Sequence, residues 1–147
     1  MQEQKAALLD IKPEEIIKRN PFAAYIGIEL LEVLPGHARA RIALEQHHEN
    51  IYGGVHGGCA FSLADTLAGI AAASYGGAVT TVDASINYLR PVMGSKNLYC
   101  AADVIRKGTK ISVIRTELTN DEGMLLIDGS FTYYHLPQSD GSRLAKY

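Results

Sequence analysis

One carboxylate stands alone in a long apolar segment. Between residues 57 and 82, Asp65 is the only residue that is acidic, basic or a histidine. Alanine and leucine dominate the segment, which predicts a helix, and only Ser62 lies close enough along that helix to help solvate the carboxylate. A carboxylate in such surroundings is costly unless it is paired. Either it binds backbone amides of a neighbouring loop, or it does chemistry as a nucleophile or a general base.

The start of the same segment offers a second chemical group. Gly57 and Gly58 open the predicted helix, where backbone N–H groups lack partners and the helix dipole favours negative charge. Without a side chain, a glycine also lets a substrate carbonyl approach the backbone closely. In acyl transfer, one N–H aimed at the developing oxyanion contributes roughly 3–4 kcal/mol. The alternative is that the glycines only permit a tight turn from loop to helix.

The spacing of these two groups has a geometric consequence. Eight residues at about 1.5 Å per residue separate Asp65 from Gly57 by roughly 12 Å along the helix. A nucleophile must lie about 3 Å from the carbon whose oxygen the N–H binds. If both groups are catalytic, Gly57 of one subunit must therefore face Asp65 of another, which requires a symmetric dimer with two composite sites.

The elements that must position these groups are mostly strands. A central helix is predicted over about 57–74, buried nearly all round, and a short helix that Pro13 begins is predicted over about 13–20. Alternating apolar residues between short turns predict strands, at 26–34, 37–45, 80–91, 98–106, 111–119 and 124–135. Hairpins around one helix predict an α+β domain with an antiparallel sheet curled around that helix. The tail, 137–147, is expected to be frayed.

Length and composition limit the classes of function. A single domain accounts for residues 1–147, and the net charge of −2 argues against a general nucleic-acid binder. The run 57–74 is a poor membrane helix because it contains Asp65 and three hydroxyl residues. The two cysteines form no disulfide framework and indicate a reducing compartment. The N-terminus has no pattern of a secretory signal, so we expect a cytoplasmic protein.

The order of elements and the string HGGCAFSLAD together resemble the hotdog-fold acyl-CoA thioesterases, specifically their phenylacetic-acid-degradation branch. The likeness runs from about residue 26 to 135, and its motif comprises Asn50, HGG at 56–58, Asp65 in SLAD and INYLRPV at 86–92. It implies a hotdog fold, a homodimer with a continuous sheet that often doubles into a dimer of dimers, and hydrolysis without a metal. We expect an aryl- or medium-chain acyl-CoA as substrate and no cofactor, because coenzyme A is part of the substrate.

The resemblance also implies roles for single residues. Asn50 contacts the nucleophile or the attacking water, His56 helps to orient the thioester carbonyl, and Thr81, a hydroxyl residue at the start of the next strand, positions water. As lone residues, Asn50 and His56 could simply stabilise their loop. Strand alternation places Thr81 on the face opposite the helix. Either the strand bulges or Thr81 reaches the site of a partner subunit.

Further residues are candidates for binding the substrate. By resemblance, the set that approaches the carbonyl or the coenzyme A phosphates is Gly58, Arg90, Arg106, Lys107, Gly108 and Lys110. Exposed basic turns also occur for solubility alone. Candidates for lining the acyl pocket are Phe61, Leu63, Tyr75 and Tyr88.

Several alternatives compete with this function. Cys59 lies in the first turn of the predicted helix near His56, where a thiol with a lowered pKa could be a covalent nucleophile, although a small core-facing cysteine is commoner. A weak metal-site alternative comprises His47, His48, Glu49 and His56; we expect no metal. On the same fold, an enoyl-CoA hydratase or dehydratase and a non-catalytic acyl-CoA-binding regulator are the remaining alternatives.

Overall fold

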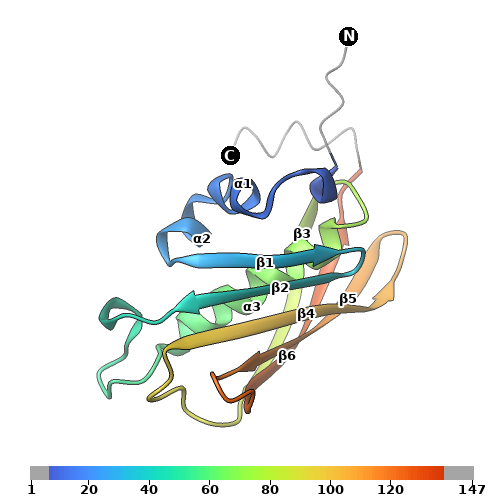
Figure 1. Cartoon of the computed structure of the whole chain (residues 1–147). Coiled ribbons are helices and arrows are strands. Elements are labelled where there is room, and N and C mark those ends of the chain that lie inside the picture. The colour runs from blue at the N-terminus through green and yellow to red at the C-terminus, as the bar shows by residue number, and fades with distance from the viewer. Residues whose placement is uncertain (1–6, 138–147) are drawn as a thin grey trace.

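A computed structural model describes residues 7–137, and a six-stranded antiparallel sheet forms most of it. The strands are β1 (Ile28–Leu34), β2 (His37–Ala43), β3 (Val79–Tyr88), β4 (Asn97–Lys107), β5 (Ile111–Thr119) and β6 (Leu125–His135). They are ordered β1-β2-β4-β5-β6-β3, so β1 and β3 are the two edges. The sheet curls around helix α3 (Gly57–Ala73) without closing (Figure 1).

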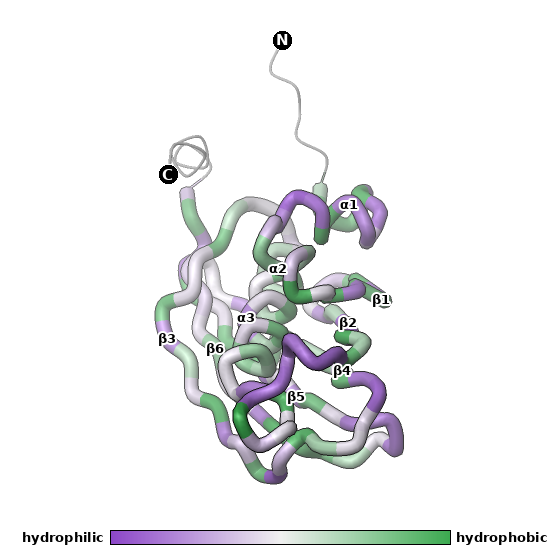
Figure 2. The backbone as a smooth tube through the Cα atoms, turned by 90° about the vertical axis from the view of Figure 1, so that its left-hand side faces the viewer, coloured by the Kyte–Doolittle hydropathy of each residue, from purple (hydrophilic) through white to green (hydrophobic). Residues whose placement is uncertain are grey.

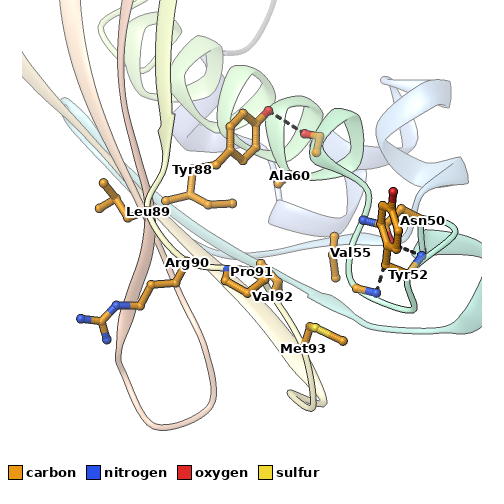
Figure 3. Close-up of a pocket in the computed structure, with 13 residues that line it drawn as sticks. Asn50, Tyr52, Val55, Ala60, Tyr88, Leu89, Arg90, Pro91, Val92 and Met93 are labelled. Carbon is orange, nitrogen blue, oxygen red and sulfur yellow. Dashed lines mark hydrogen bonds between the residues drawn. The ribbon is translucent and has the colours of Figure 1, made fainter.

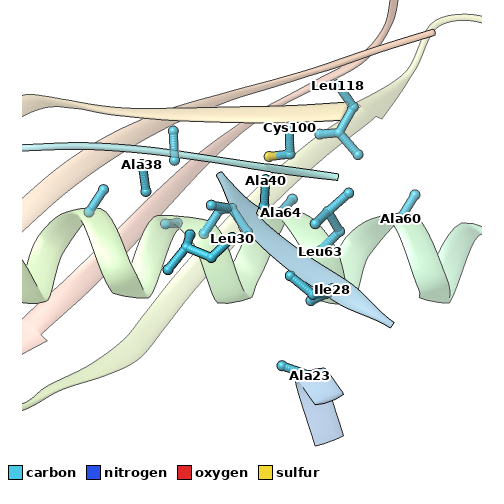
Figure 4. Close-up of a cluster of buried hydrophobic side chains, with 14 of the residues drawn as sticks. Ala23, Ile28, Leu30, Ala38, Ala40, Ala60, Leu63, Ala64, Cys100 and Leu118 are labelled. Atoms are coloured by element: carbon cyan, nitrogen blue, oxygen red, sulfur yellow. The ribbon is translucent and has the colours of Figure 1, made fainter. Parts of the chain in front are cut away.

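Helix α3 lies in the hollow of the curled sheet. Seen nearly along its axis, it has β3 and β6 on one side and β1, β2 and β4 on the other (Figure 2). Its buried side chains are alanines and leucines, at 60, 63, 64, 67, 68, 71 and 72. Ala38 and Ala40 on β2 and Cys100 on β4 face this surface (Figure 4). Small side chains on both surfaces let the helix pack closely against the sheet.

Short helices precede the sheet and contact its first strand. They are η1 (Leu8–Asp10), α1 (Pro13–Lys18) and α2 (Pro21–Tyr25), and a further turn, η2 (Gln46–His48), follows β2. The helix predicted over 13–20 ends earlier, at Lys18, because Asn20 caps a second helix that begins at Pro21. Helices α1 and α2 lie beside β1 (Figure 1), whereas none of the ten residues of β3 is buried. Helices therefore pack beside the edge strand β1, whereas the other edge strand, β3, has no buried residue.

Strand β3 departs from regular alternation at one position. Thr81 pairs with Tyr133 and Asp83 pairs with Thr132, which leaves Val82 as an extra residue in a β-bulge. Val82 therefore does not follow the alternation of the strand, and its side chain is 58% exposed. The bulge turns Thr81 to the same face of the sheet as Tyr133, toward α3. The first of the two alternatives for Thr81 therefore holds.

Three further expectations concern the end of the central helix, the C-terminal tail and a membrane-spanning helix. Helix α3 ends one residue before the predicted limit, at Ala73. Of the tail predicted over 137–147, all but the first residue lies outside the described range. Among the helices of residues 7–137, none combines the length and the apolar character that crossing a membrane requires.

Candidate active site

Asp65 lies in the middle of α3, and its half-buried carboxylate points toward β3 and β6. Its Oδ1 accepts a hydrogen bond from Thr81 Oγ1 at 2.8 Å and from the Tyr133 hydroxyl at 2.6 Å. Within residues 7–137, Oδ2 has no hydrogen-bond partner. Ser62, the expected partner, instead donates to the carbonyl of Gly58 at 2.8 Å. The carboxylate is thus paired, by hydroxyl groups from two strands, and one of its oxygens stays free to react.

Tyr133 is a site residue that sequence reasoning missed. Its ring is buried, and its hydroxyl lies near both the carboxylate and the backbone carbonyl of Asp65. Burial, together with the neighbouring carboxylate of Asp65, raises the pKa of Tyr133, so the phenol keeps its proton and acts as a donor. The available signal was a tyrosine on the apolar face of a strand, since a buried tyrosine needs a partner for its hydroxyl.

Gly69 makes room for Tyr133. It lies one turn after Asp65 in the interior of α3, where a glycine is less stable than an alanine by about 0.5–1 kcal/mol. A Cβ atom at this position would lie 3.1 Å from the Tyr133 hydroxyl oxygen and 3.2 Å from the ring carbon Cε1. The missing side chain therefore has a packing reason, which is the close approach of the tyrosine to the helix.

The first turn of α3 leaves one N–H group free. His56 is the N-cap residue, and its Nδ1 accepts the N–H of Gly58 at 2.8 Å. The carbonyl of His56 accepts the N–H groups of Cys59 and Ala60. Within residues 7–137, the N–H of Gly57 has no acceptor. Of the two glycines, Gly57 is therefore the one that offers an unpaired donor.

The His56 ring itself is left with a donor as well. Because Nδ1 accepts a hydrogen bond, the neutral ring carries its proton on Nε2. The side chain is exposed, so this N–H can reach a substrate. A capping role and a substrate-facing role are compatible in the same ring.

Asn50 stabilises its own loop and still has a free donor. Its Oδ1 accepts the N–H of Tyr52 at 2.9 Å and that of Gly54 at 3.3 Å. The side-chain amide nitrogen has no hydrogen-bond partner within residues 7–137. The loop-stabilising alternative thus describes one end of the side chain, and the NH₂ group at the other end remains able to donate.

A cavity of about 390 Å³ lies against the start of α3. The loop at 50–55, the first turn of α3 and the segment 88–93 supply its mostly apolar walls (Figure 3). Tyr88, which lines it, donates its hydroxyl to the carbonyl of Gly57 at 2.9 Å. The other three predicted acyl-pocket residues lie elsewhere: Leu63 is fully buried, Phe61 packs on Phe131, and Tyr75 lines another cavity.

That other cavity, of about 510 Å³, lies at the far end of α3 and is more polar. Lys107 and Gly108 line it together with His135, whose pKa is lowered by burial and by the charge of Lys107. The Lys107 ammonium also lies 4.4 Å from the centre of the Tyr75 ring.

The predicted substrate-binding residues are divided between the two cavities. Arg106 and Lys110 are exposed on the same β4–β5 hairpin as Lys107 and Gly108. Arg90 lines the first cavity, and Gly58 belongs to the first turn of α3. The structure therefore brings four of the six together and leaves two at the other end of the helix.

The competing constellations fit the structure less well. Burial raises the pKa of Cys59, which is the opposite of what a nucleophilic thiol needs. The histidines of the metal-site alternative have other partners: His48 Nε2 lies 2.7 Å from the Ile26 carbonyl, and His56 caps α3. In the described part of the chain, no three histidine, cysteine or acidic side chains are grouped as metal ligands would be.

A curled antiparallel sheet wrapped around one long helix defines the class of this protein, the hotdog fold, as the sequence predicted. The thioesterase superfamily model matches residues 52–127, and the chain belongs to that family. The acyl-coenzyme A thioesterase PaaI of Escherichia coli is 30% identical over 100 residues, which cover 68% of this chain and 71% of the relative. The predicted resemblance to the phenylacetic-acid-degradation branch is confirmed.

Solved structures agree with this assignment of the fold. The E. coli PaaI protein from the phenylacetic acid degradation operon aligns with a TM-score of 0.80 at 24% identity, over 86% of this chain and 92% of that one. A hypothetical thioesterase from Streptococcus pneumoniae TIGR4, solved with coenzyme A, aligns with a TM-score of 0.77 at 27% identity, over 83% and 98% of the two chains.

Proposed function

We propose that this protein hydrolyses an aryl- or medium-chain acyl-CoA to the free acid and coenzyme A. The proposal rests on the geometry of the Asp65 carboxylate: two hydroxyl groups bind Oδ1, and within residues 7–137 Oδ2 has no partner. The chain that carries this carboxylate belongs to the thioesterase superfamily. The E. coli relative is named an acyl-CoA thioesterase, and the S. pneumoniae neighbour contains coenzyme A. The reaction consumes water and needs no cofactor.

Asp65 acts through its free oxygen, Oδ2, by one of two routes. As a nucleophile, it attacks the thioester carbon, the C–S bond breaks to release the coenzyme A thiolate, and water then hydrolyses the acyl-Asp65 anhydride. As a general base, it takes a proton from a water molecule that attacks the same carbon, with Thr81 positioning that water. Trapping of an acyl-Asp65 species identifies the first route.

The oxyanion that forms in either route is bound by Gly57 of the facing subunit. Among the described residues 7–137, the N–H of Gly57 has no acceptor, and about 12 Å of helix separates it from Asp65 in the same chain. His56 Nε2–H and the Asn50 NH₂ group are the further donors proposed around the carbonyl and the attacking group. Each site is then shared between two subunits.

The edge strand β3 supports a dimer. No residue of β3 is buried, and in the described part of the chain no strand pairs with its outer edge, to which a partner strand can bind. Pairing of β3 with β3 of a second copy continues the sheet across the dimer. The resemblance to the phenylacetic-acid-degradation branch further supports a dimer of dimers.

The coenzyme A end of the substrate is assigned to the polar cavity. Lys107, Arg106 and Lys110 supply positive charge there, and Gly108 lets phosphate oxygens approach the backbone. Asp65 lies about 12 Å of helix from this end of α3, a span that an extended pantetheine arm covers. The two free thiols, Cys59 and Cys100, support a cytoplasmic location.

A panel of acyl-CoA thioesters, with release of thiol as the signal, tests the proposal. We expect Asp65→Asn to leave a folded dimer and to lower hydrolysis by orders of magnitude. Asp103→Asn is the matched control, because that carboxylate is exposed and bonds to His37 on the sheet. Full activity of Asp65→Asn would overturn the proposed function.

The same assay separates the two alternatives on this fold. With an enoyl-CoA, a hydratase changes the enoyl absorbance without releasing thiol, whereas a thioesterase releases thiol. A binding regulator retains acyl-CoA across the whole panel without turnover. Either of these results in the wild-type protein contradicts hydrolysis as its function.

A further inference from the structure

Two hydroxyl groups meet at one oxygen of Asp65. Thr81 and Tyr133 are paired residues on neighbouring strands, and both donate to Oδ1. Thr81 is exposed, whereas Tyr133 is buried. A carboxylate held at one oxygen by two donors cannot rotate freely about its χ2 torsion.

We propose that Tyr133 is a positioning residue for the hydrolysis: its hydroxyl fixes the Asp65 carboxylate so that Oδ2 faces the substrate. This inference rests on the proposed function of Asp65. Tyr133 itself does not touch the reacting atoms, since its hydroxyl is turned to Oδ1 and to the backbone carbonyl of Asp65.

The orientation of the Asp65 carboxylate depends on these two donors. Within residues 7–137, the hydroxyls of Thr81 and Tyr133 are the side-chain groups hydrogen-bonded to it, and no basic group forms an ion pair with it.

Gly69 provides a second, independent sign that the helix accommodates this hydroxyl. An alanine at that position would place its Cβ 3.1 Å from the hydroxyl oxygen, which is closer than the two atoms tolerate without a shift. The phenol would then have to shift by a few tenths of an ångström from the position in which it donates to Oδ1. Gly69→Ala is therefore a way to displace the hydroxyl without removing it.

The test compares Tyr133→Phe with Tyr134→Phe in the full-length protein. The first change removes the hydroxyl and keeps the buried ring, while the second removes the hydroxyl of the half-buried neighbour on β6, which has no bond to Asp65. Both kcat and KM for one acyl-CoA are measured under conditions in which thermal unfolding shows each variant folded.

In Tyr133→Phe, we expect kcat to fall about tenfold with little change in KM, because a hydrogen bond to a charged group is lost from the reacting residue. Gly69→Ala lowers kcat by less, and Tyr134→Phe leaves both kcat and KM unchanged.

The outcomes distinguish this inference from the function on which it rests. An unchanged kcat in Tyr133→Phe, with Asp65→Asn inactive, overturns the positioning role and leaves the hydrolysis standing. Equal losses in Tyr133→Phe and Tyr134→Phe overturn it as well, because they would report only a general effect on β6. An active Asp65→Asn removes the proposed function and the role of Tyr133 together.

Discussion

The two ends of helix α3 differ in how their backbone groups are hydrogen-bonded. At its last turn, Ser74 is buried, donates to the Ala71 carbonyl and accepts the N–H of Gly36 at 2.7 Å. At its first turn, the N–H of Gly57 is left without an acceptor within residues 7–137, beside an apolar cavity. A helix end that only supports the fold has its backbone groups satisfied. The end with an unsatisfied donor is the one that is available for chemistry.

The strongest test of this contrast removes the free donor and nothing else. Gly57 is the first residue of α3, a position where proline is well tolerated, and His56 already has the extended ψ of 131° that a following proline requires. We expect Gly57→Pro to lower kcat by about 10²–10³-fold, because the oxyanion loses its N–H. Gly57→Ala, which keeps the N–H, should lose far less. Equal kcat values for the two variants would show that this N–H has no catalytic part.

Mixing two inactive variants tests whether each site is shared. In a dimer of one Gly57→Pro chain and one Asp65→Asn chain, one site carries both defects and the other carries neither. When equal amounts of the two variants are unfolded and refolded together, random pairing makes half of the dimers mixed. Because one of the two sites in each mixed dimer is intact, about a quarter of the wild-type activity should return. Sites contained within one chain predict no recovery, so an inactive mixture, with mixed dimers demonstrated by mass spectrometry, contradicts the composite site.

A smaller effect is expected at the polar end of the helix. Lys107→Gln removes one positive charge from the cavity assigned to coenzyme A, so KM should rise by about tenfold while kcat stays nearly constant. The difference should shrink in high salt, which screens the phosphate charges. Lys96→Gln, an exposed lysine just before the opposite end of β4, is the control. A fall in kcat without a change in KM would count against phosphate binding by Lys107.

The smallest effect on activity is expected where the helix end is purely structural. Ser74→Ala leaves the buried N–H of Gly36 unpaired, which lowers the free energy of unfolding by about 1–3 kcal/mol. Denaturation by urea measures this loss, and kcat at a temperature where the variant is folded should match the wild type. An unchanged unfolding midpoint would mean that another group replaces the serine.

The strands and the central helix follow from local sequence patterns, and their ends were predicted to within three residues. Ala38, Ala40 and Ile42 are buried as their alternation indicates, and α3 begins at Gly57. Short-range patterns suffice here because burial repeats every two residues in a strand and along one face of a helix. The isolation of Asp65 among apolar residues also marked it as a candidate for chemistry in the middle of the helix.

The geometry around that carboxylate could not be predicted in the same way. The bulge at Val82 depends on how β3 pairs with β6, and strand alternation taken alone gives Thr81 the wrong face. Tyr133 lies 68 residues from Asp65 in the chain, so their contact is a result of tertiary packing. Local patterns locate the elements, while the hydroxyl groups that surround Asp65 are set by the register between strands.

The dimer proposed to form through the edge strand β3 would make activity depend on the concentration of the protein. If each site needs Gly57 from a second copy, a lone chain is inactive, and the fraction of active protein follows the law of mass action. Activity per chain then falls as the protein is diluted below the dissociation constant of the dimer. The concentration of the protein would set the onset of hydrolysis, without any separate inhibitor.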